Sequence, residues 1–239
     1  MQRIACWTNL SETTFLLPSD KADYRLRIFT PRQELPFAGH PTIGSAHAAL
    51  ESGFVAKKRT LTQECGAGII ELSLEADGRI FLGAPQPKIA QVDGSFEYGR
   101  NPLRVDVGPV WIVAELPSAA ELAALQPDMA AISALSNSLD ATGITLFAPA
   151  GESSCAIHVR SFAPAHGIPE DPVCGSGNIS VAAYLRHTGS LQKIGASYTA
   201  RQGMQLGRDG RVSVRVGENQ IQIGGHAVTC VDGALKIGV

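Results

Sequence analysis

The chain has 239 residues, which is enough to bury a sizeable core in one large domain or in two smaller lobes. Its hydrophobic fraction of 44% and charged fraction of 18% are ordinary for a globular protein. The net charge of −2 with no lysine/arginine cluster gives no indication of nucleic-acid binding, and no apolar run approaches a membrane span. No signal peptide opens the sequence, so we expect a cytoplasmic protein.

The elements of the N-terminal part are predicted from hydrophobic periodicity and turn residues. They are the end of a helix at residues 1–7, strands at 13–17 and 24–29, a helix from Pro41 to just before Gly53, and a hairpin of strands 69–74 and 79–82. Proline suits the first helical turn and glycine suits the residue after the last turn. This helix is mostly small and apolar, so we expect sheet to surround it.

A proline-rich stretch between Pro85 and Pro102 is the predicted boundary between two lobes. The elements beyond it are strands at 110–114, 144–148 and 156–162, helices at 119–125 and 180–187, and a closing hairpin of strands 212–216 and 220–223. Each lobe is therefore predicted as antiparallel strands around one small-residue helix. The predicted class is α+β, built twice.

Two segments, residues 27–50 and 160–185, repeat the same pattern: Arg-x-Phe-x-Pro, then a glycine turn that opens an alanine-rich helix. The repeat continues downstream, because Gly39 precedes Gly66 by 27 positions and Gly175 precedes Gly203 by 28. We interpret this pattern as a duplicated half-domain with one helix N-terminus in each copy.

A helix N-terminus presents unpaired N–H groups and the positive end of the helix dipole, and glycine there lets a ligand approach the backbone. We therefore predict that Gly39-His40 and Gly175-Ser176-Gly177 bind a substrate carboxylate. The alternative is that these glycines only permit tight turns.

Three polar residues lie at element junctions, where catalytic groups often sit: Glu12, His40 and Asp171. From the residues alone, simpler interpretations compete with catalysis. Asp171 before Pro172 suits an Asx-turn, and Glu12 suits an exposed charge.

No cofactor or metal site is predicted. Gly66-Ala67-Gly68 lacks the third glycine of a dinucleotide loop and precedes a strand-like segment. The cysteines are scattered, odd in number and never paired as Cys-x-x-Cys, which argues against disulfides and against a zinc site; they are Cys6, Cys65, Cys155, Cys174 and Cys230.

Several motifs resemble the PhzF-like isomerase family of phenazine biosynthesis, which shares a superfamily with diaminopimelate epimerase and proline racemase. They run from end to end of the chain: residues 9–15 (Asn-Leu-Ser-Glu-Thr-Thr-Phe), 27–31, 34–41 (with Gly-His-Pro), 66–68, 162–164, 170–172 (Glu-Asp-Pro), 175–176, 202–203 and 207–208.

The resemblance implies two pseudo-symmetric lobes like those of diaminopimelate epimerase, each an antiparallel β-barrel around a central helix, with an active site in the cleft between them. The lobes would be residues 1–90, completed by 228–239, and residues 100–227. It also implies a homodimer. Glu12 corresponds to the family's acid/base glutamate, and His40, Asp171 and Ser176 to its other active-site residues.

The predicted function is a cofactor-independent isomerase that moves a proton within a small amino- or hydroxy-substituted carboxylate. One alternative is an epimerase or racemase that uses Cys174 with Glu12, and another is a non-catalytic carboxylate-binding relative. The sequence does not identify the substrate.

Two departures from the family pattern bear on these alternatives. Cys174 resembles the second thiol of the two-cysteine racemases, and a helix N-terminus would lower the pKa of such a thiol. The position of the first thiol is Ala38, however, so a two-thiol racemase is excluded. The chain also begins inside the helix that follows the family's first strand, which we interpret as a misassigned start or a truncation.

Overall fold

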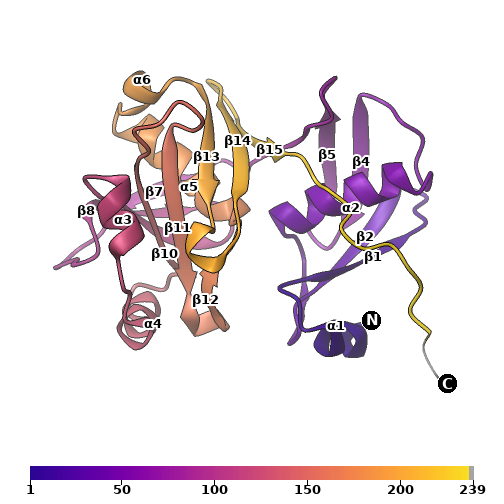
Figure 1. Cartoon of the computed structure of the whole chain (residues 1–239), viewed down its shortest axis with the longest axis horizontal. Helices are drawn as coiled ribbons and strands as arrows, with labels where there is room; N and C mark the ends of the chain where they lie inside the picture. Colours follow the sequence, from indigo (N-terminus) through magenta and orange to yellow (C-terminus); the bar gives the residue numbers. More distant parts are fainter. Residues whose placement is uncertain (237–239) are drawn as a thin grey trace. The chain divides into compact units, whose positions relative to one another are not determined.

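The computed structural model of the chain describes residues 1–236, which divide into two compact units (Figure 1). The first unit contains Met1–Phe81 and the chain from Gly225 onward, and the second contains Leu82–Gly224. The chain thus enters the second unit before the predicted boundary. Ala84 N donates to Ile221 O at 2.7 Å, so the chain already contacts the second unit ahead of that boundary.

The first unit is built on a small sheet in the order β1-β2-β4-β5, with β3 beside β2. Its elements are α1 (Gln2–Thr8), β1 (Thr13–Leu17), β2 (Tyr24–Phe29), β3 (Glu34–Leu35), α2 (Gly39–Glu51), β4 (Thr60–Cys65) and β5 (Gly68–Leu74), followed by β6 (Ile80–Gly83), in which the boundary falls. The helix at the N-terminus, both predicted strands and α2 lie where the sequence predicted them.

The second unit is built on a larger sheet in the order β15-β14-β13-β11-β10-β9-β8-β7, with β12 beside β11. Its strands are β7 (Lys88–Gln91), β8 (Arg100–Asp106), β9 (Val110–Glu115), β10 (Gly143–Pro149), β11 (Ile157–Ala163), β12 (Ile168–Asp171), β13 (Ser197–Gln202), β14 (Gly210–Val216) and β15 (Ile221–Gly225). Its helices are α3 (Ala119–Ala124), α4 (Met129–Ser138), α5 (Gly175–His187) and α6 (Leu191–Ile194), with 3₁₀ turns η1 (Pro164–His166) and η2 (Met204–Leu206).

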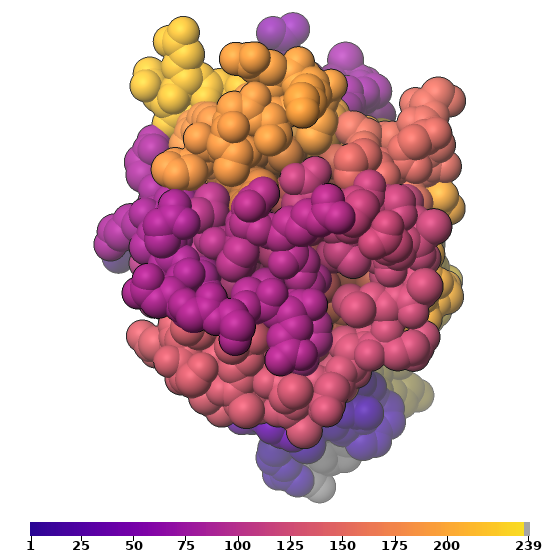
Figure 2. Space-filling model, turned by 90° about the vertical axis from the view of Figure 1, so that its left-hand side faces the viewer, coloured from indigo at the N-terminus to yellow at the C-terminus, as the bar shows by residue number. Residues whose placement is uncertain are grey.

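Strand pairing is mostly antiparallel, as predicted, but three pairs are parallel: β2 with β4, β9 with β10, and β11 with β13. The sequence did not predict these pairs. Each joins strands that are separated along the chain by a helix, which is the connection that parallel neighbours require. Figure 2 shows the surface of the second unit over which the segment containing β7 and β8 runs.

The predicted duplication is confirmed element by element within the two units. β2, β3, α2, β4 and β5 in the first unit correspond to β11, β12, α5, β13 and β14 in the second, with the same pairings. In both copies, the glycine that follows the strand after the helix packs closely against the proline that precedes the helix. A Cβ on Gly66 would lie 2.8 Å from Pro36 Cα, and one on Gly203 would lie 2.5 Å from Pro172 O.

The two central helices differ in burial. α5 is buried continuously from Gly177 to Leu185, as expected for a helix surrounded by sheet. The buried residues of α2 follow one face, including Thr42, Ser45 and Ala49, and the rest of the helix is half-buried apart from the exposed Ala48 and Glu51. The first helix is therefore less enclosed than we expected, because the small sheet of the first unit covers one side.

No helix within residues 1–236 combines the length and apolar character needed to cross a membrane.

Candidate active site

Glu12 and His40 form a close pair in the first unit. α1 ends at Asn9, whose left-handed backbone (φ 51°) turns the chain, and Glu12 lies just before β1. His40 is the second residue of α2. His40 Nε2 lies 3.0 Å from Glu12 Oε2, and the Glu12 side chain is only 11% exposed. The interpretation of Glu12 as an exposed charge is therefore wrong.

Two opposing influences act on the carboxyl group of Glu12. Burial raises its pKa, because a charged carboxylate loses hydration. The hydrogen bond and charge of His40, together with a hydrogen bond from Ser11, outweigh burial and leave the pKa below its ordinary value. Glu12 is therefore ionised at neutral pH, although its burial by itself favours the neutral carboxylic acid.

The N-terminus of α2 has no side-chain cap. Ala38 is the N-cap residue in an extended conformation, and its carbonyl accepts from Thr42 N at 3.2 Å. Pro41, the third helical residue, has no N–H. The N–H groups of Gly39 and His40 are consequently the first two donors of the helix, and an α-helix supplies no internal acceptor for such groups.

The N-terminus of α5 is capped by a thiol. Cys174 is the N-cap residue, and its Sγ accepts from Gly177 N at 3.3 Å. The N–H of the third residue of α5 is therefore already hydrogen-bonded. In α2 the third residue is Pro41, which has no N–H. The prediction that Gly177 binds a carboxylate through its N–H needs correction, which leaves Gly175 and Ser176 as the donors at this end.

Packing gives a direct reason for glycine at position 177. A Cβ there would lie 2.6 Å from Ser161 Oγ and 3.0 Å from Thr145 Oγ1. These two buried hydroxyl groups hydrogen-bond each other at 3.0 Å between β10 and β11. Close packing, rather than the tight turn that the sequence suggested as the alternative, therefore accounts for this glycine.

Two neighbours contact the hydroxyl group of Ser176. Trp111 Nε1 in β9 donates to Ser176 Oγ at 2.9 Å, and Cys174 Sγ lies 3.6 Å from the same oxygen. An indole N–H only donates, so Ser176 accepts from it and can donate its own proton to Cys174 Sγ or to another acceptor. Trp111 is a residue that sequence reasoning missed.

Asp171 ends β12 and shapes the turn into α5. Its Oδ1 accepts from Val173 N at 2.9 Å, which is the Asx-turn that the sequence allowed. Its backbone carbonyl accepts from Gln202 Nε2 at 2.8 Å, and Gln202 Oε1 accepts from Asn178 Nδ2 at 2.8 Å. Through Gln202, β13 thereby fixes both the loop that precedes α5 and the first helical turn of α5.

Gln202 and Asn178 were not predicted as site residues. A similar bond exists in the first unit, where Gln63 Nε2 in β4 donates to Thr42 Oγ1 in α2 at 3.2 Å. Thr42 and Asn178 are equivalent, each being the fourth residue of its helix, but the repeat aligns Gln202 with Cys65, so it did not single out the glutamine. A glutamine on the strand thus bonds the same helical position in both units.

The expected lowering of the Cys174 pKa is wrong. Burial removes the thiolate from water and raises the pKa of Cys174, the charge of Asp171 raises it further, and the hydrogen bonds that favour the thiolate do not compensate. The thiol is 4% exposed. Cys174 is therefore a protonated helix cap.

The structure brings the predicted residues together in two sets. Glu12, Gly39 and His40 lie close in the first unit, and the second set, in the second unit, consists of Asp171, Cys174, Gly175, Ser176 and Gly177. Two open surface hollows of the second unit, of about 550 and 450 Å³, are lined by none of these residues.

Comparison with known proteins gives a consistent result. The family model described as phenazine biosynthesis-like protein (PhzC-PhzF) matches residues 1–233. Antisense-enhancing sequence 1 of Schizosaccharomyces pombe is 42% identical over 262 residues, which cover 98% of this chain and 87% of that protein. The trans-2,3-dihydro-3-hydroxyanthranilate isomerase of Pseudomonas chlororaphis is 32% identical over 256 residues, 99% of this chain and 88% of that one.

Solved structures agree. A PhzF-family protein of Bacillus anthracis matches with a TM-score of 0.85 and 25% identity, over 95% of this chain and 85% of its own. A hydroxyproline epimerase from Agrobacterium vitis matches with a TM-score of 0.61 and 16% identity, over 90% of this chain and 72% of its own. This match shows a likeness of fold alone. The chain belongs to the PhzC-PhzF phenazine biosynthesis-like family and is an isomerase with that family's mixed fold.

Proposed function

We propose that this isomerase moves a proton between two carbons of a small amino- or hydroxy-substituted carboxylate, without a cofactor, with Glu12 as the group that carries the proton. The observation that supports this most strongly is the Glu12–His40 pair, with 3.0 Å between Nε2 and Oε2 and a Glu12 side chain that is only 11% exposed. The family membership supports the reaction class.

A proton shuttle must be stable in two states. His40 favours the ionised Glu12, which is the form that removes a proton from carbon, whereas burial favours the neutral form that returns it. The influence of His40 prevails, because the pKa of Glu12 lies below its ordinary value, so Glu12 starts the reaction ionised and able to accept a proton. Burial opposes this influence and limits how far the pKa falls.

The other predicted residues receive supporting roles. Within each unit, the first N–H of the central helix, at Gly39 in α2 and at Gly175 in α5, is a donor that stabilises the negative charge of a carboxylate. Ser176 donates the hydroxyl proton that Trp111 leaves available. Asp171 shapes the loop that precedes α5 and accepts or donates a hydrogen bond to the ring or amine of the substrate.

The Cys174 epimerase is the weaker alternative. A second base in such a reaction has to be a thiolate at neutral pH, and burial of Cys174 opposes ionisation. The epimerase and racemase structures that resemble this chain are 16–23% identical to it and show the fold alone.

The experiment is a screen of small carboxylates for isomerisation, followed by NMR. The panel includes trans-2,3-dihydro-3-hydroxyanthranilate, the compound named for the Pseudomonas relatives, and the methyl ester of each acid. We expect turnover of at least one acid and none of its ester, because the ester lacks the charge that the helix N-termini bind. Equal turnover of acid and ester would contradict the carboxylate site.

Variants of two glutamates provide the matched test of the base. Glu12→Gln should lower kcat by about 10²–10⁴-fold, the usual contribution of a positioned base. Glu51→Gln is the control, because Glu51 also approaches a histidine of α2, His47, at 3.6 Å, but on the exposed face. We expect Glu51→Gln to retain full activity. Equal activity of the two variants would exclude Glu12 as the base.

A further inference from the structure

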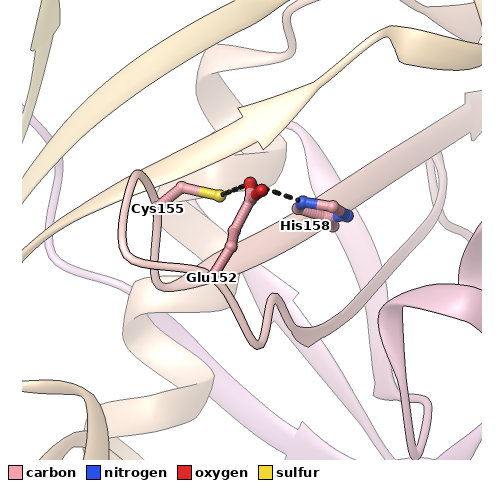
Figure 3. A group of neighbouring side chains, drawn as sticks. All are labelled: Glu152, Cys155 and His158. Carbon is pink, nitrogen blue, oxygen red and sulfur yellow. Dashed lines mark hydrogen bonds and ion pairs between the residues drawn. The ribbon is translucent and has the colours of Figure 1, made fainter.

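Three side chains with different metal-binding atoms converge at the beginning of β11. Glu152 and Cys155 lie in the loop between β10 and β11, and His158 is the second residue of β11 (Figure 3). Glu152 Oε1 accepts from Cys155 Sγ at 2.9 Å and lies 3.3 Å from His158 Nε2. All three donor atoms lie within 4.8 Å of one another.

These separations match a coordination sphere. Carboxylate oxygen, thiolate sulfur and imidazole nitrogen bind zinc at about 2.0–2.3 Å, so tetrahedral ligand atoms lie roughly 3.5 Å apart. The contacts of 2.9 and 3.3 Å are close to that value, and the third separation is below 4.8 Å. The sequence argued against zinc because no cysteines are paired, but two of these three ligands are not cysteines.

The group is partly buried and has a positively charged neighbour, Arg201. Cys155 is 5% exposed, the His158 side chain is 15% exposed and Glu152 at 37% faces solvent, so the group is open on one side. Arg201 approaches Glu152 Oε1 with its NH1 at 3.4 Å, but its Nε is held by Asp209 at 2.6 Å. The guanidinium thus has a second carboxylate partner, Asp209, which it shares with Arg211, and does not depend on Glu152 alone.

We propose that Glu152, Cys155 and His158 bind one zinc ion, with water in the fourth position. The ion replaces the thiol proton of Cys155, which leaves to solvent, and no other bond is broken. A dipositive ion with one thiolate, one carboxylate and a neutral imidazole carries no net charge, so the nearby Arg201 does not repel it. None of the three ligands takes part in the proposed isomerisation, and this inference is independent of it.

Zinc binding would join the β10–β11 loop to the sheet. Glu152 and Cys155 belong to the loop, and His158 pairs in the parallel register with Arg201 of β13. A ligand that binds only the folded state raises its stability by mass action. We therefore expect one equivalent of zinc to raise the melting temperature of the metal-stripped, reduced protein.

The experiment uses cobalt(II) as a spectroscopic probe of the full-length protein. Stripped, reduced wild type should develop a thiolate-to-cobalt charge-transfer band that saturates at one equivalent and is abolished by zinc. Glu152→Gln, Cys155→Ser and His158→Gln should each weaken cobalt binding at least tenfold, and Cys155→Ser should lose the thiolate band. Cys230→Ser is the control, because Cys230 is an exposed free thiol elsewhere in the chain; it should behave as wild type.

Folding of the variants is checked separately, because Cys155 is buried. Glu152 is exposed, so Glu152→Gln should keep the wild-type near-ultraviolet circular dichroism and still lose cobalt affinity. Absence of the thiolate band in wild type would overturn the proposal. So would a band that persists in Cys155→Ser, or a folded Glu152→Gln variant with unchanged affinity.

Discussion

At the scale of single residues, the acid/base properties of Glu12 depend on His40. The carboxyl group is nearly buried, which alone would raise its pKa, and the neighbouring imidazole reverses the direction. His40 therefore decides the pH at which Glu12 becomes a base. This dependence can be measured separately from the rate itself.

His40→Gln should move the acid limb of the kcat/KM–pH profile to higher pH. Without the imidazole, burial dominates and the pKa of Glu12 rises, so the carboxyl group is protonated, and inactive as a base, up to a higher pH. The measurement is kcat/KM against pH for wild type and variant. His47→Gln, which removes the exposed histidine of the same helix, should leave the profile unchanged. An acid limb that does not move in His40→Gln would contradict the coupling.

Cys174 provides a second prediction at this scale. Iodoacetamide should alkylate the exposed thiols of Cys6 and Cys230 in the native protein and leave Cys174 unmodified, because burial raises its pKa and limits access. Peptide mass spectrometry reads each site, and urea-unfolded protein should be labelled at all three. Rapid alkylation of native Cys174, blocked by a bound carboxylate, would restore the reactive-thiol interpretation.

At the scale of elements, the position of α5 depends on the absence of a side chain at Gly177. Gly177→Ala should destabilise the protein by about 1–3 kcal/mol, because the new methyl group would displace Ser161 or Thr145 and disturb their hydrogen bond. Gly44→Ala in α2 is the control, since a Cβ there meets no atom within 4 Å. It should stabilise by about 0.5–1 kcal/mol. Urea unfolding measures both, and equal effects would contradict the packing account.

The duplicated Arg–Glu pairs allow a similar comparison. Arg160 binds Glu170 at 2.8 Å with both side chains below 8% exposed, and its NH1 also donates to Leu122 O and to Leu125 O, at 3.0 and 2.8 Å. The equivalent pair, Arg27–Glu34, is exposed. The same pair thus anchors α3 in one unit and lies on the surface of the other.

Glu170→Gln should therefore cost about 3–5 kcal/mol of unfolding free energy, because it leaves the Arg160 guanidinium buried without a counter-charge. Glu34→Gln should cost much less, since water and salt already screen its partner. Urea unfolding of both variants is the measurement. A comparable loss in both would show that burial does not determine the contribution of this pair.

At the scale of the whole molecule, the repeat predicted much of the fold. Strands β1, β2, β9 and β14 and the helix α5 follow from periodicity and from glycine and proline positions, which are local signals. The parallel pairs β2–β4 and β11–β13 could not be predicted in this way. They join segments far apart in the chain, and no local pattern encodes which strands become neighbours.

The candidate site also combines features that the sequence predicted with features that it could not show. The sequence identified Glu12 and His40 as candidates, but their contact depends on the turn at Asn9, which directs the chain from α1 toward α2. Trp111 was missed because it lies on a strand 65 residues from Ser176, within a run of buried residues. The pKa of Cys174 was predicted in the wrong direction because burial, which the sequence does not show, outweighs the helix dipole.

The central claim is that Glu12 carries the proton, and solvent exchange tests it most directly. The wild type, Glu12→Gln and Glu51→Gln are incubated in D₂O with the best carboxylate from the screen, and NMR follows deuterium at the reacting carbons. The account predicts deuterium incorporation by wild type and by Glu51→Gln, and loss of incorporation in a folded Glu12→Gln variant. Deuterium incorporation by Glu12→Gln at the wild-type rate would contradict it.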